Sequence, residues 1–300
     1  MNIKKYGNHN YDIIHFSWTL IDYCNYSCYY CSEKHKLVDD SRNKTISTHQ
    51  LIIQRLKRFD KPFNIDLFGG EPTLHPNLPK IIDDLIQIEL CRVVNIITNL
   101  SRPIAYFEKI NEKKSDKVFV LASFHLEYFN DGFIEKIIKI NNMQHISLEV
   151  IVNLTEKSED WPTIVNFIEI LKKNNIKYLL HSLQNTRLWS VEYKQEFFDT
   201  FKPLEYKIPG YEFEYEDGTI KTFSNLEVQE KGLHQLTGVK CNPKYFIFEL
   251  DGTLKNVCTE EIFKKIVFNS KDIDKEVTCS TETCGCEIMY NFPKKQNEIV

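Results

Sequence analysis

Residues 21–34 read Ile-Asp-Tyr-Cys-Asn-Tyr-Ser-Cys-Tyr-Tyr-Cys-Ser-Glu-Lys, and their three cysteines, Cys24, Cys28 and Cys31, are spaced as C-x3-C-x2-C. A short loop of this kind can turn three thiolates towards one centre, and thiolates prefer iron–sulfur clusters or zinc. A structural zinc ion normally takes four ligands, whereas a cluster held by three cysteines keeps one iron open. The spacing therefore predicts a metal-binding loop, either a cluster with an open iron or a zinc knuckle closed by His35.

A second motif follows further along the chain, where the apolar run 63–68 leads into Gly69-Gly70-Glu71-Pro72. Glycines at a strand end let a ligand approach the backbone, and the glutamate beside them can receive an ammonium group. The two motifs together resemble the radical S-adenosylmethionine (SAM) superfamily. This resemblance implies that the three cysteines hold a [4Fe–4S] cluster whose open iron binds SAM. It also implies that Gly69, Gly70 and Glu71 bind the SAM amino group.

The composition is that of an ordinary soluble globular protein, with 42% hydrophobic residues, 27% charged residues and a net charge of −4 over 300 residues. The sequence has no excess of basic residues that would indicate a nucleic-acid partner. It also has no apolar run with the length of a membrane span or the position of a signal peptide. We therefore expect a cytoplasmic protein without a membrane partner. Its nine cysteines are then expected to be metal ligands rather than disulfides. The exception is Cys91, which we interpret as a buried thiol at the end of a helical pattern.

Strand-like apolar runs alternate with helical patterns from residue 13 to residue 182, which is typical of βα units on a parallel sheet. The predicted strands span 13–20, 63–68, 93–98, 118–123, 146–152 and 177–181. The predicted helices span 47–59, 77–90, 104–112, 133–141, 163–173 and 191–201. Ser47 and Gln50 form a capping box for the first helix, and Asn77 with Pro79 opens the second. Periodicity alone also allows a doubly wound sheet; the resemblance implies an α/β fold with a (β/α)6 partial TIM barrel over residues 1–205.

Ligands of parallel barrels bind at the carboxyl ends of the strands, so the residues after each predicted strand are candidate SAM contacts. By resemblance, Asn99 and Ser123 position the ribose or carboxylate, and Tyr30 lies near the adenine. His125 and Asn153 are candidate contacts for SAM or substrate. Taken singly, each of these side chains is equally well explained as a helix cap or as a polar group that forms hydrogen bonds within a turn. Leu100 stands where family members often have a glycine, which leaves the backbone of that turn open.

The pattern changes after Pro209, where segments 211–223 and 245–257 alternate around Asp-Gly pairs and predict two β-hairpins. The arrangement resembles the twitch domain, a reduced relative of the SPASM domain, and implies an auxiliary-cluster domain over residues 206–300. A second [4Fe–4S] cluster would use four of five cysteines, namely Cys241, Cys258, Cys279, Cys284 and Cys286. One of the last three would be spare, either as a hydrogen-atom donor or as a buried thiol. A four-cysteine zinc ribbon is the alternative.

The resemblance implies an enzyme that reductively cleaves SAM to a 5′-deoxyadenosyl radical and takes a hydrogen atom from a substrate. Its electrons would come from a donor such as flavodoxin or ferredoxin. We expect the substrate to be a small molecule or sugar that is oxidised or rearranged. The alternative is a peptide that is cross-linked or epimerised, although the early position of Cys24 leaves no room for a leading peptide-recognition domain. A zinc-binding adaptor, which has no need of the Gly-Gly-Glu motif, and an RNA-modifying enzyme, which needs a basic patch, are further alternatives.

Overall fold

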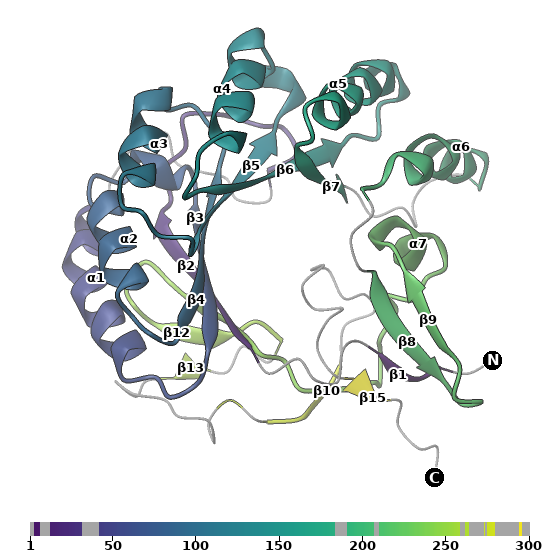
Figure 1. The fold of residues 1–300 in the computed structure, drawn as a ribbon. Coiled ribbons are helices and arrows are strands. Elements are labelled where there is room, and N and C mark those ends of the chain that lie inside the picture. Colours follow the sequence, from purple (N-terminus) through teal and green to yellow (C-terminus); the bar gives the residue numbers. More distant parts are fainter. Residues whose placement is uncertain are drawn as a thin grey trace.

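The computed structural model describes residues 3–6, 13–31, 42–183, 191–206, 210–258, 262–263, 273, 275–279 and 294–295. The larger of its two sheets has nine strands in the order β13-β12-β11-β2-β3-β4-β5-β6-β7. The smaller sheet has six strands in the order β14-β10-β15-β1-β8-β9. Figure 1 shows the curve of the large sheet, with α1 to α5 on its convex side and β8 and β9 facing its concave side.

The strands of the large sheet are β2 (Ile14–Ile21), β3 (Phe63–Gly69), β4 (Cys91–Thr98), β5 (Val118–Phe124), β6 (Ser147–Leu154), β7 (Lys177–Ser182), β11 (Tyr245–Phe248), β12 (Leu254–Asn256) and β13 (Ile262–Phe263). Those of the small sheet are β1 (Ile3–Tyr6), β8 (Tyr211–Tyr215), β9 (Ile220–Phe223), β10 (Lys240–Cys241), β14 (Val277–Thr278) and β15 (Lys294–Lys295). The helices are α1 (Arg42–Lys57), α2 (Leu78–Ile86), α3 (Ile104–Asn111), α4 (Asp131–Asn141), α5 (Trp161–Lys173), α6 (Val191–Phe201) and α7 (Asn225–Glu230). None of the helices in the described part of the chain has the length and apolar character needed to cross a membrane.

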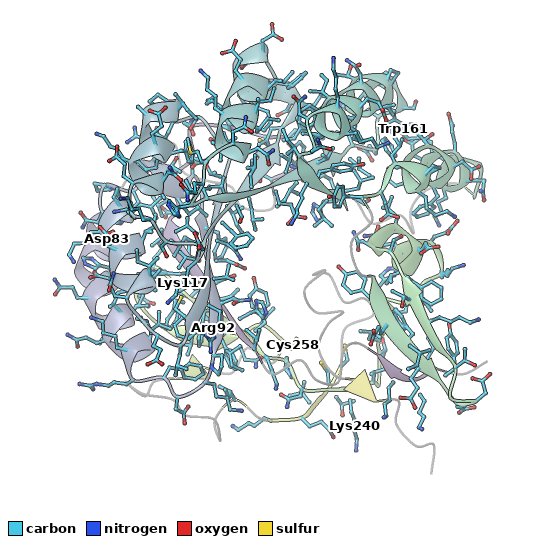
Figure 2. The ribbon with its side chains drawn as sticks, in the orientation of Figure 1. Asp83, Arg92, Lys117, Trp161, Lys240 and Cys258 are labelled. Carbon is cyan, nitrogen blue, oxygen red and sulfur yellow. The ribbon has the colours of Figure 1, made fainter. Side chains whose placement is uncertain are left out.

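The six strands β2 to β7 are parallel and alternate with helices, which confirms the predicted α/β partial barrel. Along β3 and β5 the buried side chains alternate with partly exposed ones, as expected for strands covered by helices on one face. In β2, Phe16 and Trp18 are fully buried, and Phe16 packs edge-on against Phe59, two residues after α1, and Phe63 of β3. Further round, Trp161 at the start of α5, labelled in Figure 2, packs against aromatic rings of α6.

The predicted C-terminal hairpin 245–257 forms, and it joins the barrel sheet. Its first strand β11 pairs with β2 in parallel, with Tyr245 opposite His15 and Phe248 opposite Trp18. The other predicted hairpin, 211–223, forms as β8 and β9 and pairs with β1. Strand β1 was not predicted, because four residues cannot show a reliable period. The predicted boundary between residues 205 and 206 stays a prediction, but the barrel sheet contains strands from both sides of it.

Several predicted helix bounds are wrong. Helix α1 begins at Arg42, so Ser47 lies inside the helix and does not open a capping box. Helix α2 ends at Ile86, short of the predicted end at residue 90, because β4 already begins at Cys91. The expected buried thiol of Cys91 is confirmed, although this residue starts a strand. Helices α4 and α5 each begin two residues before their predicted starts.

Helix α1 holds the hairpin onto the sheet through a buried arginine, which leads to a first prediction. Arg55 donates from Nη1 to the carbonyl oxygen of Gly252 at 2.6 Å, and Thr48 donates to the carbonyl oxygen of Leu250 at 3.2 Å. Because hydrogen bonds from charged donors are strong, Arg55→Met is expected to lower the free energy of unfolding by about 1.5–3 kcal/mol. Chemical denaturation measures the change. The matched control Lys57→Met, at an exposed position of the same helix, is expected to change it by less than about 0.5 kcal/mol. Equal stability of the two variants would contradict the contact.

Candidate functional site

The predicted site residues gather where β2 to β5 end. The cysteine loop follows β2, and the Gly-Gly-Glu segment ends β3. Asn99 follows β4, and Ser123 and His125 lie at the end of β5. Because the carboxyl ends of parallel strands meet at one edge of the sheet, segments far apart in the sequence become neighbours here.

The Gly-Gly-Glu segment is packed directly against the backbone that leads into the cysteine loop. Gly70 donates its N–H to the carbonyl oxygen of Ile21 at 2.7 Å, and Glu71 donates its N–H to that of Tyr23 at 2.8 Å. A Cβ atom on Gly69 would lie 2.1 Å from the carbonyl oxygen of Ile21, and one on Gly70 would lie 1.9 Å from that of Tyr23. Gly69 also has a φ of 135°, which favours glycine. Both glycines are therefore required by the approach of the cysteine loop itself.

The carboxylate of Glu71 is buried, with 1% of the residue exposed, and is held by four donors. Oε1 accepts from the backbone N–H and hydroxyl of Thr73 and from the hydroxyl of Thr98, and Oε2 accepts from the backbone N–H of Asn99 at 2.7 Å. Burial raises the pKa of Glu71, and these hydrogen bonds oppose that shift. Glu71 thus fastens the ends of β3 and β4 together. The contact of Glu71 with the SAM amino group stays a prediction. Oε2 accepts fewer of these hydrogen bonds than Oε1, so it is the oxygen better able to accept one more.

Asn99 links the end of β4 to the cysteine loop. Its Nδ2 donates to Oδ1 of Asn25 at 3.1 Å and approaches Sγ of Cys24 at 3.9 Å. The next residue, Leu100, has a φ of 54°, so it adopts the left-handed conformation that glycine favours. The ammonium group of Lys136 binds the Leu100 carbonyl oxygen and holds the turn in place. The turn that the sequence left open therefore keeps its glycine-like shape.

Two tyrosines of the cysteine loop are anchored by the turn after β5. Tyr26 stacks on Tyr128 with ring centroids 3.8 Å apart and planes 8° apart, and Ser27 donates its N–H to the Tyr128 hydroxyl at 2.7 Å. The hydroxyl of Tyr30 lies 2.7 Å from Nδ1 of His125. Tyr26 and Tyr128 were missed by the sequence reasoning. The only available signal was the frequency of aromatic residues in the loop, which does not indicate a partner.

Beside this loop lies a small cleft with a volume of about 10 Å³. Its lining includes three of the predicted SAM contacts, Asn99, Ser123 and His125, together with Tyr26 and Tyr128. Pockets that hold a whole drug-sized ligand usually enclose about 300–1,000 Å³. In this conformation the cleft therefore has room for about one water molecule and is too small for SAM.

The three cysteines suit a cluster by their donor chemistry, because thiolates prefer such centres. Burial raises the pKa of Cys24, and the nearby Glu71 and Cys31 raise it further. Burial also raises the pKa of Cys28 to about 11, with Cys24 and Cys31 among the neighbours that add to the shift. Within the described residues no three His, Cys, Asp or Glu side chains surround a single point closely enough to hold one metal ion. Three thiols in one short loop are the protein ligands that a [4Fe–4S] cluster with one open iron takes. The residues present therefore fit such a cluster, and His35, the fourth ligand of the zinc alternative, lies outside the described residues.

Asn153 lies apart from the cleft, near the end of β6. Its Nδ2 donates to the carbonyl oxygen of Phe124 at 3.0 Å, and its Oδ1 lies 3.3 Å from Nδ1 of His181. The two ends of the Asn153 amide thus contact the strands on either side of β6, which are β5 and β7. A contact of Asn153 with SAM stays a prediction.

The C-terminal cysteines are only partly described. Cys241 ends β10, whose partner β14 leads directly to Cys279, and the Cys279 N–H donates to the carbonyl oxygen of Val239 at 2.8 Å. Cys258, labelled in Figure 2, follows β12 and is exposed. Cys284 and Cys286 lie outside the described residues. The auxiliary cluster therefore stays a prediction.

A polar network on the interior face of the sheet was also missed. Asp66 of β3 accepts from Nδ2 of Asn95 in β4 at 2.5 Å and from the hydroxyl of Ser17 in β2 at 3.4 Å. The Ser17 hydroxyl also lies 2.6 Å from that of Tyr245 in β11. Burial raises the pKa of Asp66 to about 6, opposed by both hydrogen bonds. Polar residues at every second strand position were the available signal for this network.

Comparison with known proteins gives a consistent result. A family model described as the radical SAM superfamily matches residues 18–186, more than half of the chain. The GTP 3′,8-cyclases of Crocosphaera subtropica and Microcystis aeruginosa are each 30% identical over 84 residues, which is 27% of this chain and 25% and 26% of those proteins. The chain thus matches about a quarter of the length of these curated relatives.

Two solved structures share the fold. The structure of anSMEcpe with bound AdoMet has a TM-score of 0.54 at 16% identity and covers 84% of this chain and 77% of its own. The structure of anSMEcpe with bound AdoMet and Kp18Cys peptide has a TM-score of 0.50 at 16% identity, with coverage of 84% and 76%. At this identity the likeness shows the fold alone.

Proposed function

The chain belongs to the radical SAM superfamily, and on that premise we propose that it cleaves SAM reductively and takes a hydrogen atom from its substrate. The observation that carries the proposal is the contact between the two motifs, in which the glycines of the Gly-Gly-Glu segment pack on the backbone of the cysteine loop. When bound, the cluster and SAM would supply the 5′-deoxyadenosyl radical. The protein supplies the ligands, the orientation and the shielding from water.

Each part of the site has its own role in this proposal. Cys24, Cys28 and Cys31 bind the cluster. The backbone at Gly69 and Gly70, backed by Glu71, receives the SAM amino group. The remaining SAM contacts are drawn from the cleft and its surroundings, namely Tyr30, Asn99, Ser123, His125 and Asn153. The convergence of three of these residues on one cleft supports this assignment.

We extend the proposal to a second [4Fe–4S] cluster in the C-terminal part of the chain. Cys241 ends β10, Cys279 directly follows the neighbouring strand β14, and Cys258 follows the hairpin that continues the barrel sheet. Four thiolates drawn from these residues and the two further cysteines would complete the ligand set. Such a cluster would accept an electron from the substrate radical and make the net reaction an oxidation, which would class the enzyme as an oxidoreductase.

The substrate class that we favour is a small polar molecule. Ser17, Asp66, Asn95 and Tyr245 place carboxylate, amide and hydroxyl groups on the inner face of the sheet, where hydroxyl or amino groups of a substrate find partners. The curated relatives, whose name specifies GTP, favour the same class. We therefore propose a sugar, cyclitol or nucleotide-linked substrate. A donor such as flavodoxin or ferredoxin would supply the electrons.

A peptide substrate is the second candidate. The observation that favours it is the structural neighbour that holds a peptide. The two candidates are distinguished by measuring whether a peptide or a small polar molecule raises the rate of SAM cleavage.

The proposed function is tested by anaerobic reconstitution with iron and sulfide, followed by dithionite and SAM. We expect a brown protein with about eight irons that releases 5′-deoxyadenosine, and about four irons in a variant with both Cys241 and Cys258 replaced by alanine. Colourless protein that contains zinc and leaves SAM intact would contradict the proposal and support the zinc-binding alternative.

A further inference from the structure

Asp66 is a carboxylate in the middle of β3 that faces the concave side of the large sheet. Its neighbours along the strand, Ile65 and Leu67, are fully buried under the helices of the convex side, so Asp66 lies on the opposite face, where it is partly exposed (Figure 1). Burial raises its pKa to about 6, and hydrogen bonds from Asn95 and Ser17 oppose that shift. The side chain is therefore mostly ionised at pH 7, and no cation among the described residues offsets its charge.

The polar groups around Asp66 are arranged as donors. Asn95 donates from Nδ2 to Oδ1 of Asp66 at 2.5 Å, and the Ser17 hydroxyl donates to Oδ2 at 3.4 Å. Because a hydroxyl has one proton, the Tyr245 hydroxyl is then the donor in its contact of 2.6 Å with Ser17. An ionised carboxylate has about four sites that accept hydrogen bonds. Oδ2, which accepts one long bond from these groups, can therefore receive a further donor.

A second carboxylate on this face, Glu149 of β6, differs from Asp66 in having a cation. Glu149 lies between the buried Leu148 and Val150 and stands opposite Lys177 of β7. Burial raises the pKa of Glu149, and the charge of Lys177 opposes the shift. Charged groups that are largely removed from water are normally paired in proteins. The described part of the chain supplies such a partner for Glu149 but not for Asp66.

Asp66 also lies at a suitable depth below the segment assigned to SAM. It precedes Gly69 by three residues on the same strand, which corresponds to about 10 Å at the usual rise of a strand. Binding residues of parallel barrels lie towards the carboxyl ends of the strands. A small molecule held at Asp66 would therefore extend along the sheet towards the Gly-Gly-Glu segment.

We propose that Asp66 binds a primary ammonium group of the substrate, while Asn95 and Ser17 hold the carboxylate in place. The inference rests on the function proposed above and narrows its substrate to an amine. An ammonium group supplies a positive charge and three donors, and hydrogen bonds between charged groups are the strong ones. A hydroxyl group would leave the charge of Asp66 unmatched, and a phosphate group would be repelled. An amino sugar and a lysine side chain share this chemistry.

The test measures the binding of defined amines to the oxidised, cluster-loaded protein with SAM at pH 7. The probes are glucosamine and Nα-acetyl-lysine amide, and their uncharged N-acetylated forms serve as ligand controls. Dissociation constants come from ligand-observed NMR titrations of the wild type, Asp66→Asn and Glu149→Gln. Glu149→Gln is the matched control, because it removes a carboxylate of the same face that has its own cation. Thermal unfolding of the same proteins reports structural effects.

We expect the wild type to bind an amine saturably and to bind neither N-acetylated form. Asp66→Asn is expected to weaken amine binding by about 10-fold or more, and Glu149→Gln to leave it unchanged. The amide in Asp66→Asn still accepts from Asn95 and no longer carries an unmatched charge, so this variant is expected to unfold at the wild-type temperature or above it. Tighter binding of glucosamine would support an amino sugar, and tighter binding of the lysine probe would support a peptide.

The inference would be overturned by a wild type that binds neither amine, by equal binding of an amine and its N-acetylated form, or by equal loss of binding in the two variants. Unchanged binding in an Asp66→Asn protein that unfolds at a lower temperature would also overturn it, because a purely structural role gives that result. A wild type that cleaves SAM but binds no amine would contradict the inference alone. A wild type that binds the amine through Asp66 but leaves SAM intact after reduction would contradict the proposed function.

Discussion

Replacing Cys24, Cys28 and Cys31 together by alanine is expected to reduce SAM cleavage to the background rate while the fold is kept. The reason is chemical, because without the three thiolates no cluster can be held at the end of β2. The loop itself stays anchored by contacts that the cysteines do not make, namely those between Tyr26 and Tyr128 and between Asn25 and Asn99. Chromatographic assay of 5′-deoxyadenosine measures the loss, and circular dichroism checks the fold.

The matched control for this variant is Cys91→Ala. Cys91 is fully buried at the start of β4, and burial raises the pKa of its thiol to about 12. Its replacement is expected to lower the stability by about 1 kcal/mol and to leave SAM cleavage unchanged. If the triple variant still cleaved SAM, the assignment of the cysteine loop would be wrong.

Gly70→Ala is expected to lower SAM cleavage by about 100-fold or more, although it adds only one methyl group. The new Cβ would lie 1.9 Å from the carbonyl oxygen of Tyr23, so either the Gly-Gly-Glu segment or the cysteine loop must move. Displacements of about 1 Å in a site that orients reacting groups can cost this much. The overpacking is also expected to lower the free energy of unfolding by roughly 1–3 kcal/mol. Iron content, SAM cleavage and chemical denaturation are measured on the same preparations.

The control variant Gly218→Ala separates the effect of the Cβ collision at position 70 from the general effect of replacing a glycine. Gly218 has a φ of 81° in the β8–β9 turn, but a Cβ atom added to it would have no neighbour within 4 Å among the described residues. This variant is expected to lose roughly 1 kcal/mol of stability through backbone strain and to keep its cluster. Equal SAM cleavage by Gly70→Ala and Gly218→Ala would show that the two motifs do not depend on each other.

The barrel and the central motifs were predictable because their signals are local. Cys24, Cys28 and Cys31 lie within eight residues, and the alternation of β2 to β7 with helices repeats six times. The direction of the Glu71 side chain was not predictable, because its partners Thr98 and Asn99 come from the next strand along. Sequence spacing shows which residues share a loop, but it does not show which neighbour a side chain turns to.

Long-range contacts account for the other differences between the structure predicted from the sequence and the observed one. The parallel pairing of β11 with β2 joins residues more than 200 positions apart, and the stack of Tyr26 on Tyr128 joins two loops. Neither leaves a period in the sequence. The bounds of α1 were missed for a different reason, since Ser47 and Gln50 imitate a capping box inside a helix that begins earlier.

The most direct test of the cluster assignment is the EPR spectrum of the reduced, reconstituted protein before and after SAM is added, in the Cys241→Ala/Cys258→Ala background. We predict the signal of one reduced [4Fe–4S] cluster whose shape changes when SAM binds the open iron. The absence of that signal, or a signal that SAM leaves unchanged, would contradict the claim that Cys24, Cys28 and Cys31 hold a cluster that binds SAM.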